Sequence, residues 1–274
     1  MGTRGSGTVF FSHCNLSCVY CQNHRISSEG FGREVTTERL ACILLDIGAR
    51  AENVNLVSPT HYAPVVTEAV RIAKASGLRV PVVWNSNAYE SPETIQALNS
   101  LVDIYLPDLK YFSEESAVRY SAVPGYFAAA SRAIEEMNAQ VGEVQTDGRG
   151  VARKGLIIRH LVLPGLVEES LAVLEWVRTR LGRRTWVSLM AQYCPAHRAG
   201  DYPEIARPIL TAEYQAVVER FIELGFEGGY CQERSAASLA FVPDFDLSGM
   251  DPVDRADPPS ALKVPNSEPC HSSF

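Results

Sequence analysis

Short apolar segments alternate along this chain with longer segments of helical periodicity. The apolar segments are rich in Val, Ile, Leu and aromatic residues, as expected of buried strands, and lie at 8–12, 53–57, 81–85, 103–107, 156–163 and 186–190. Helices are predicted at 37–50, 64–77, 92–100, 113–121, 126–141, 167–181 and 211–224. This alternation implies right-handed crossovers and a parallel α/β sheet covered on both faces. About six strand–helix units fit either an incomplete barrel or an open doubly wound sheet.

One domain is expected to account for most of the chain. Of its 274 residues, 46% are hydrophobic, which is enough apolar material for a sizeable core over residues 1–247. From residue 248 onward the periodicity ends and Pro, Ser and Asp predominate, so we predict a disordered tail over 248–274. The polar, glycine-rich stretch at 140–154 predicts a surface excursion before the fifth strand.

The charge balance excludes several classes of partner. The formal net charge is -7, so no basic field is available to attract nucleic acid phosphates or anionic lipid. No apolar run approaches the roughly 18 to 20 residues of a membrane helix, and the N-terminal segment lacks the features of a secretory signal. The sequence therefore predicts a cytoplasmic protein that binds neither nucleic acid nor membrane.

Three of the seven cysteines crowd into one segment directly after the first predicted strand. Cys14, Cys18 and Cys21 have the spacing C-x3-C-x2-C, which suits a metal site in a reducing compartment better than paired disulfides. In barrel folds the C-terminal end of a strand is where the chemistry lies. A four-iron cluster has four corners to ligate, so three thiolates would leave one iron free for an added chelating ligand.

A structural zinc site is one alternative use of these cysteines. His24 could join Cys14, Cys18 and Cys21 in a tetrahedral set of ligands. Against this reading, no second Cys/His pair lies at the distance typical of a zinc finger. A large α/β domain also needs no metal to hold it together.

A non-catalytic electron-transfer protein is the other alternative. It would close the cluster with a fourth cysteine, drawn from Cys42, Cys194 or Cys231. Cys42 lies in a helical pattern and Cys231 in a glycine-rich stretch, so structural roles are assigned to both. Cys194, near the end of the sixth strand, is the candidate fourth ligand, and Cys270 in the predicted tail is an incidental thiol.

Polar residues follow the ends of successive predicted strands, on the face where a barrel carries its active site. They are Thr60 after the second strand, Asn85 and Asn87 after the third, Asp108 and Lys110 after the fourth, Arg159 in the fifth and Gln192 after the sixth. Asp108 and Lys110 are two residues apart on an extended segment and point the same way, so they could bind a ligand or form a local ion pair. Arg159 lies in an otherwise apolar strand, where an unpaired guanidinium is rare. His160 faces the other way and is expected to be an ordinary surface or core histidine.

Sequence segments between Gly2 and Pro195 resemble the pyruvate formate-lyase-activating enzyme family of the radical SAM superfamily, in particular its uncharacterised iron–sulfur branch. They are GTRGSGTVFFSHCNLSCVYCQN, NLVSPTHY, VVWNSNAYE, DIYLPDLKY, RHLVLPG and SLMAQYCP. The resemblance implies a partial (β/α)6 TIM-type barrel, the radical SAM core. It also implies a [4Fe-4S] cluster on Cys14, Cys18 and Cys21 whose fourth iron chelates the amino and carboxylate groups of S-adenosylmethionine (SAM).

The same resemblance suggests residues that contact SAM. Tyr20, the aromatic residue of the C-x3-C-x-aromatic-C pattern, would lie beside the adenine, and Asp108 and Lys110 would contact the ribose and carboxylate. The other predicted SAM-binding residues are Thr60, Asn85, Asn87, Arg159 and Gln192. In the family, a Gly-Gly-Glu stretch after the second strand meets the methionyl amine, and here Ser-Pro-Thr at 58–60 takes its place. No catalytic residue beyond the cluster ligands is assigned.

The resemblance further implies an activity and partners. A reduced cluster would donate one electron to SAM, which would release methionine and a 5′-deoxyadenosyl radical that takes a hydrogen atom from a substrate. By analogy alone, the substrate would be a glycine of a partner protein, which becomes a glycyl radical, and a flavodoxin or ferredoxin would supply the electron. The chain begins almost at the first strand, without the cysteine-bearing segment usual upstream in this branch. We therefore expect a truncated gene product or a short form with a more open site.

Overall fold

The computed structural model describes residues 2–233 and 242–250. Its centre is a sheet of parallel strands in the order β1-β2-β3-β4-β6-β7-β8, to which β5 adds an antiparallel pairing with β6. The strands are β1 Gly7–Phe10, β2 Val54–Val57, β3 Val82–Asn85, β4 Ile104–Tyr105, β5 Gln145–Thr146, β6 Ala152–Leu161, β7 Trp186–Met190 and β8 Gly229–Cys231. Strands β1 and β8 stand at the two ends of the sheet. This confirms the predicted open, partial barrel, whereas the predicted tail beyond residue 250 and Cys270 lie outside the described residues.

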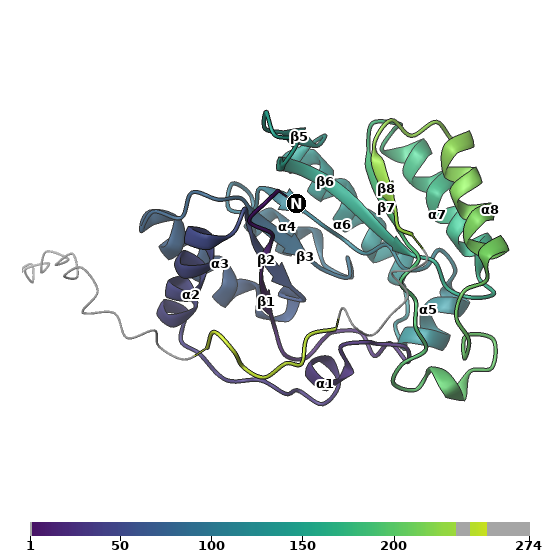
Figure 1. The fold of residues 1–274 in the computed structure, drawn as a ribbon, viewed down its shortest axis with the longest axis horizontal. Coiled ribbons are helices and arrows are strands. Elements are labelled where there is room, and N and C mark those ends of the chain that lie inside the picture. Colours follow the sequence, from purple (N-terminus) through teal and green to yellow (C-terminus); the bar gives the residue numbers. More distant parts are fainter. Residues whose placement is uncertain (1, 234–241, 251–274) are drawn as a thin grey trace, which may run out of the picture.

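Helices cover the outer side of the sheet, with α2 and α3 on one flank and α7 and α8 on the other (Figure 1). The helices are α1 His24–Ser27, α2 Thr37–Arg50, α3 Ala63–Ala75, α4 Pro92–Ala97, α5 Glu114–Ser121, α6 Tyr126–Val141, α7 Val167–Arg180 and α8 Thr211–Glu223. All the predicted helices are present, and α1 is an addition. The hydroxyl oxygens of Thr36, Ser91 and Ser113 accept hydrogen bonds from first-turn amides of α2, α4 and α5. These caps explain why those helices begin where the sequence indicated.

The stretch at 140–154 contains a β-hairpin that the sequence prediction missed. Strand β5 pairs with the start of β6, so β6 begins several residues before the predicted segment 156–163. The Asp147 carboxylate fixes the turn by accepting hydrogen bonds from the amides of Arg149 and Val151 at 2.9 and 3.1 Å. Gly155 has a φ of +125°, and a Cβ there would lie 2.5 Å from the Cα of Val144. Glycine at 155 therefore permits the segment just before β5 to pass close to β6.

Strand β8 is the second element missing from the prediction. It follows six strand–helix units and pairs in parallel with β7. A Cβ at Gly229 would lie 2.3 Å from the carbonyl oxygen of Val187, and one at Gly228 would lie 2.3 Å from the ring nitrogen of Trp186. These two glycines allow β8 to approach β7, but they also interrupt the apolar pattern by which a strand is recognised.

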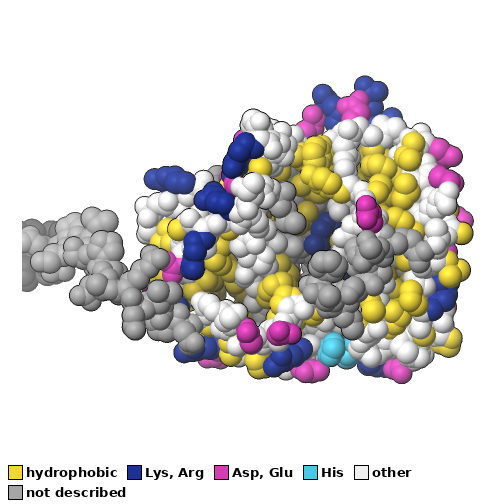
Figure 2. Space-filling view, in the orientation of Figure 1, with side chains coloured by type: hydrophobic (Ala, Val, Ile, Leu, Met, Phe, Trp, Pro, Cys, Tyr) yellow, Lys and Arg dark blue, Asp and Glu magenta, His cyan; other side chains and the backbone are white. Residues whose placement is uncertain are grey.

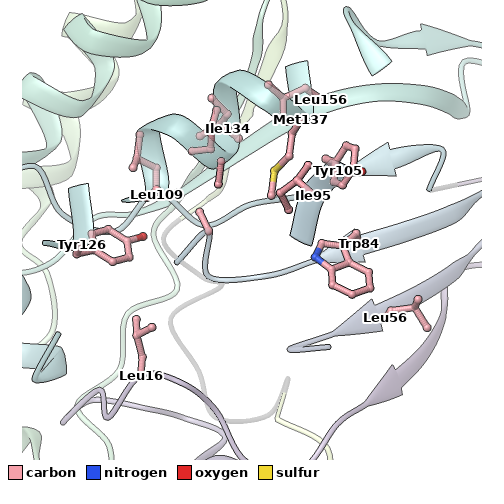
Figure 3. Close-up of a cluster of buried hydrophobic side chains, with 14 of the residues drawn as sticks. Leu16, Leu56, Trp84, Ile95, Tyr105, Leu109, Tyr126, Ile134, Met137 and Leu156 are labelled. Carbon is pink, nitrogen blue, oxygen red and sulfur yellow. The ribbon is translucent and has the colours of Figure 1, made fainter. Parts of the chain in front are cut away.

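The main hydrophobic core lies between the sheet and its helices. Trp84 and Tyr105 from β3 and β4, and Ile95, Ile134 and Met137 from α4 and α6, are all fully buried. Figure 3 shows Tyr105 and Ile95 beside the helix that carries Met137 and Ile134. Burial of each large apolar side chain contributes roughly 1.5–3 kcal/mol. This packing holds the strand ends, and the loops that follow them, in fixed positions.

An ion-pair network joins the hairpin to the segment before β2. The side chain of Glu52 has no exposed surface, and its Oε2 lies 2.9 Å from Arg149, 3.2 Å from Arg153 and 3.5 Å from Arg4. Arg153 also bonds Asp147 at 2.7 Å. Because the network lies before β2, at the end opposite the loops that follow the strands, it is expected to stabilise the fold rather than bind ligands.

Charged side chains of both signs lie on the face in view in Figure 2. Lys and Arg side chains are interspersed there with Asp and Glu side chains (Figure 2). The visible side chains therefore form no continuous basic surface for phosphates. Within the described residues, no helix is both long and apolar enough to cross a membrane.

Candidate active site

The three-cysteine loop leads from β1 into α1 and is tied to two distant segments. The amides of Ser17 and Val19 donate to the carbonyl oxygens of Ser121 and Tyr120, at the C-terminal end of α5, over 3.1 and 2.9 Å. The Val19 carbonyl in turn accepts from the amide of Arg198, in the segment after β7, at 2.8 Å. The loop is therefore held between α5 and the region beyond β7.

Each of the three thiols has a hydrogen-bonding partner. The contacts are Leu16 N to Cys14 Sγ at 3.4 Å, Asn87 Nδ2 to Cys14 Sγ at 3.5 Å, Ser121 Oγ to Cys18 Sγ at 2.9 Å and Ser27 Oγ to Cys21 Sγ at 3.2 Å. Amides and hydroxyls are donors to thiolate sulfur, so each contact can persist when the cysteine ligates metal.

The electrostatics of the loop favour a bound cationic centre. Burial raises the pKa of Cys14 and raises the pKa of Cys18 to about 12. Lys110 opposes both shifts through its positive charge. A metal bound to these sulfurs would supply the positive charge that a buried thiolate needs.

A zinc ion and a four-iron cluster place different demands on the thiols. Across residues 2–233 and 242–250, no three His, Cys, Asp or Glu side chains converge on a point that could hold one metal ion. Tetrahedral zinc needs such a point, with sulfurs about 2.3 Å from it. A four-iron cluster is ligated at separate corners. The three loop thiols can supply the three protein ligands of such a cluster, while the ring of His24, the fourth ligand of the zinc alternative, stacks on His197 with centroids 5.0 Å apart.

Asp108, Lys110 and Arg159 come together at the strand ends. Asp108 Oδ2 lies 2.9 Å from Lys110 Nζ, and Asp108 Oδ1 lies 2.6 Å from Arg159 Nε. Burial alone would raise the pKa of Asp108, but Arg159 and Lys110 outweigh it and hold that pKa well below its usual range. Burial would lower the pKa of Lys110, but Asp108 outweighs it and raises that pKa. All three side chains are therefore charged, and the group carries one net positive charge.

Tyr20 is buried among other tyrosines. It is 5% exposed, and its hydroxyl lies 2.6 Å from the hydroxyl of Tyr111. Its ring meets Tyr193 edge-on at 5.9 Å between centroids. The position of Tyr20 inside the cysteine loop agrees with the motif, and its contact with adenine stays a prediction.

The remaining predicted residues also lie in loops at the strand ends. Thr60 Oγ1 donates to the Glu90 carboxylate at 2.9 Å, and Asn87 Nδ2 lies 2.6 Å from Asn15 Oδ1 in the cysteine loop. Asn85, the last residue of β3, is buried. The structure thus brings the loops after β1, β2 and β3 into contact with one another.

Gln192 connects the cysteine loop to the far end of the sheet. Its carbonyl oxygen accepts from Gln22 Nε2 at 3.1 Å, and its side-chain oxygen accepts from Gln232 Nε2 at 2.9 Å. His160, by contrast, is a core residue, as expected. It is 1% exposed and bonds the carbonyl of Leu109 and the hydroxyl of Ser170 on α7.

Comparison with known proteins places this architecture in a family. The family model of the radical SAM superfamily matches residues 8–177. This chain belongs to the radical SAM superfamily. Members of this superfamily use a [4Fe-4S] cluster and SAM, which accords with the three-thiol loop.

Curated relatives of this radical SAM protein come from Methanocaldococcus jannaschii. An uncharacterized protein of that organism is 30% identical over 224 residues, which is 78% of this chain and 61% of the relative. A candidate glycyl-radical enzyme activating enzyme is 30% identical over 109 residues, which is 39% of this chain and 44% of that relative. The chain therefore spans only about half of the length of the curated relatives it matches.

Solved structures share the fold at low sequence identity. Streptococcus suis SuiB bound to S-adenosylmethionine gives a TM-score of 0.57 at 13% identity and covers 83% of this chain and 50% of SuiB. The hydrogenase maturase HydG from Carboxydothermus hydrogenoformans gives 0.56 at 14% identity over 82% of this chain and 52% of HydG. These likenesses establish the open α/β architecture of the radical SAM protein.

Glu90 is a site residue that sequence reasoning missed. It is 5% exposed, and its carboxylate accepts hydrogen bonds from Thr60, Trp84 and Ser86 at 2.9, 2.9 and 2.6 Å. Burial raises the pKa of Glu90, and no lysine or arginine of the described ranges pairs with it. The one available signal was that an acidic residue lies three positions after Asn87. An acidic residue is equally common in an ordinary surface loop.

Two of the cysteines outside the loop do not have the structural role that was predicted for them. Cys42 and Cys231 were assigned structural positions, but both are exposed. Cys42 lies outside the buried stripe of α2, and Cys231 lies on β8, at the end of the sheet. Cys194 is partly buried, and within the described chain it forms no three-residue metal group with the loop cysteines.

Proposed function

We propose that this protein is a radical SAM enzyme that holds a [4Fe-4S] cluster on Cys14, Cys18 and Cys21 and binds SAM at the adjoining strand ends. The observation that carries this proposal is the three-thiol loop itself, whose sulfurs each have a donor and whose charge is opposed by Lys110. Three protein ligands leave one iron corner for SAM.

A [4Fe-4S] cluster held by Cys14, Cys18 and Cys21 would supply the electron for reductive cleavage of SAM, which yields methionine and a 5′-deoxyadenosyl radical able to take a hydrogen atom. The protein residues bind and orient. Lys110 and Arg159 present positive charge for the SAM carboxylate, while Asp108 fixes both side chains. Glu90 offers buried carboxylate oxygens beside Thr60 to the cationic end of SAM. The loops after β1, β2 and β3 contact one another beside the cysteines, which would limit the access of water to the reacting atoms.

The substrate class that we propose is a glycine residue in a peptide or protein. One relative is named as a candidate glycyl-radical enzyme activating enzyme, and the similar structure of SuiB has been solved with a precursor peptide. Removal of one hydrogen atom from the glycine Cα would convert the 5′-deoxyadenosyl radical to 5′-deoxyadenosine and leave the unpaired electron on the peptide. The electron for the cluster would come from a flavodoxin or ferredoxin.

Formation of 5′-deoxyadenosine tests the reaction. The protein is loaded anaerobically with iron and sulfide, reduced with dithionite and mixed with SAM, and the products are quantified by mass spectrometry. We expect 5′-deoxyadenosine and methionine from the wild type and from Cys42→Ala, a control for an exposed cysteine. Cys18→Ala should lose the product. Equal product from Cys18→Ala and wild type, or none from a wild type that holds the cluster, would contradict the proposal.

Deuterium transfer tests the substrate class. The same reaction is run with a synthetic peptide that carries one glycine with two deuterium atoms at its Cα. We expect deuterium in the recovered 5′-deoxyadenosine and a carbon-centred radical signal in the frozen sample. Several glycine peptides of varied flanking sequence are tested. If 5′-deoxyadenosine forms at the same rate but carries no deuterium with any of them, the result would count against hydrogen abstraction from glycine and would leave the proposed SAM cleavage standing.

A further inference from the structure

Three buried hydroxyl groups form a continuous chain that ends at Cys18. Ser121 Oγ lies 2.9 Å from Cys18 Sγ, Tyr111 OH lies 2.7 Å from Ser121 Oγ, and Tyr20 OH lies 2.6 Å from Tyr111 OH. Ser121 is 1% exposed, Tyr111 is 0% exposed and Tyr20 is 5% exposed. Bulk water therefore does not compete for these hydrogen bonds.

The direction of the chain follows from counting protons. Each hydroxyl has one proton to donate, and a thiolate can only accept. When Cys18 ligates a cluster, Ser121 gives its proton to the sulfur, so Tyr111 must donate to Ser121. Tyr20 must then donate to Tyr111. All three O–H bonds point along the chain toward Cys18.

The backbone fixes this geometry independently of the hydroxyls. Ser121 is the last residue of α5, and its carbonyl accepts from Ser17 in the cysteine loop. The neighbouring carbonyl of Tyr120 accepts from Val19. These two bonds flank Cys18 on both sides. The backbone of Ser121 is therefore held beside Cys18 whether or not Tyr111 is present.

We propose that Ser121 and Tyr111 are positioning residues that raise the reduction potential of the cluster through a directed hydrogen bond to Cys18. Reduction adds negative charge that is shared by the ligating sulfurs, so a donor stabilises the reduced cluster more than the oxidised one. Tyr111 acts through Ser121, because its donation polarises the serine O–H bond. This inference rests on the proposed function, since it requires the cluster on the three cysteines.

The reduction potential of the cluster tests the inference directly. The anaerobically loaded protein is titrated with dithionite and redox mediators, and the reduced cluster is followed by electron paramagnetic resonance without SAM. We expect Ser121→Ala to have a more negative midpoint potential than wild type. Tyr111→Phe should shift it in the same direction by a smaller amount. The double variant should match Ser121→Ala, because Tyr111 reaches the sulfur only through Ser121.

Matched controls separate this role from general damage. Ser116→Ala removes another buried hydroxyl of α5, which bonds Glu169 at 3.1 Å. Tyr105→Phe removes another buried phenol, which bonds Gln140 at 2.7 Å. Both should keep the wild-type potential. If Ser121→Ala fails to hold a cluster, Tyr111→Phe alone still tests the shift.

The possible results distinguish this inference from the proposed function. An unchanged potential in both Ser121→Ala and Tyr111→Phe, with a wild type that holds and reduces its cluster, would overturn the inference and leave the proposed function standing. Additive shifts in the double variant would overturn the relay through Ser121. A wild type that assembles no cluster would overturn both proposals together.

Discussion

Arg159 Nε lies 2.6 Å from Asp108 Oδ1, although the two residues are 51 positions apart in the chain. Their backbones also form a parallel bridge, in which the amide of Leu109 donates to the carbonyl of Arg159 at 2.9 Å. Lys110 bonds the second oxygen of the same carboxylate. The Asp108 carboxylate therefore joins the loop after β4 to Arg159 of β6, and it also holds Lys110 of its own loop. One carboxylate between two cations leaves a net positive charge at the proposed SAM site.

Replacement of Asp108 should destabilise the fold. Asp108→Asn leaves Arg159 and Lys110 as neighbouring, largely buried cations, and the loss of one partner from such a group costs on the order of 3 kcal/mol. Denaturant unfolding at neutral pH measures the loss. Glu175→Gln, which breaks an exposed pair with Arg220, should cost less than about 1 kcal/mol. Equal costs for the two variants would contradict a buried role for Asp108.

The stability of the protein should fall in mild acid because of His160. Burial lowers the pKa of His160 below its ordinary value of 6.5, so the unfolded chain binds a proton before the folded one does. His160 therefore costs no stability above about pH 6.5. Below that pH, protonation of His160 in the unfolded chain lowers the free energy of unfolding by at most about 1.4 kcal/mol per pH unit. Denaturant unfolding between pH 7.5 and 5.5 measures this slope. His160→Gln should flatten it, and an unchanged slope in that variant would assign the decline to other groups.

The buried carboxylate of Glu90 should contribute to SAM affinity. It has three neutral donors and no cationic partner among the described residues, and a cationic ligand group nearby would supply one. A hydrogen bond to a charged group contributes about 1.5–3 kcal/mol, so Glu90→Gln should weaken binding by roughly 10- to 100-fold. Equilibrium dialysis with labelled SAM measures this.

Glu93→Gln is the control for that experiment, since Glu93 lies in the first turn of α4 and has no buried partner. It should bind SAM with wild-type affinity. If Glu90→Gln also binds like wild type while remaining folded, then Glu90 only joins the loops after β2 and β3 and does not act on SAM.

The network around Glu52 should affect stability without affecting the site. Glu52→Gln removes the charge that Arg149, Arg153 and Arg4 share, so the melting temperature should fall by several degrees. The amount of 5′-deoxyadenosine formed per cluster should be unchanged, because the network lies at the opposite end of the strands. A variant with wild-type melting behaviour would show that the arginines find other partners.

Local patterns predicted the parts of this protein that local forces determine. The helix from Tyr126 to Val141 matches its predicted bounds, since its apolar period marks it in the sequence, and in the structure it ends at Gly142. The three closely spaced cysteines likewise lie in one loop directly after β1, as the sequence predicted. Strand β8 was missed because the glycines that bring it close to β7 remove the apolar pattern.

Contacts between distant segments could not be predicted from one sequence. Ser121 and Cys18 are 103 positions apart, and nothing near Ser121 marks it as a partner of sulfur. Glu90 and Thr60 are 30 positions apart, and although Thr60 was predicted to contact SAM, nothing in the sequence pairs it with Glu90. Their roles depend on strand order and burial, which only the folded structure provides.

Binding of SAM at an open iron corner is the central claim, and the spectrum of the reduced cluster tests it most directly. Anaerobically loaded, dithionite-reduced protein is frozen with and without SAM and examined by electron paramagnetic resonance, alongside iron and sulfide analysis. We predict a [4Fe-4S] signal that SAM changes, and loss of that signal in Cys18→Ala. A cluster signal that SAM leaves unaltered, or bound zinc without inorganic sulfide, would contradict it.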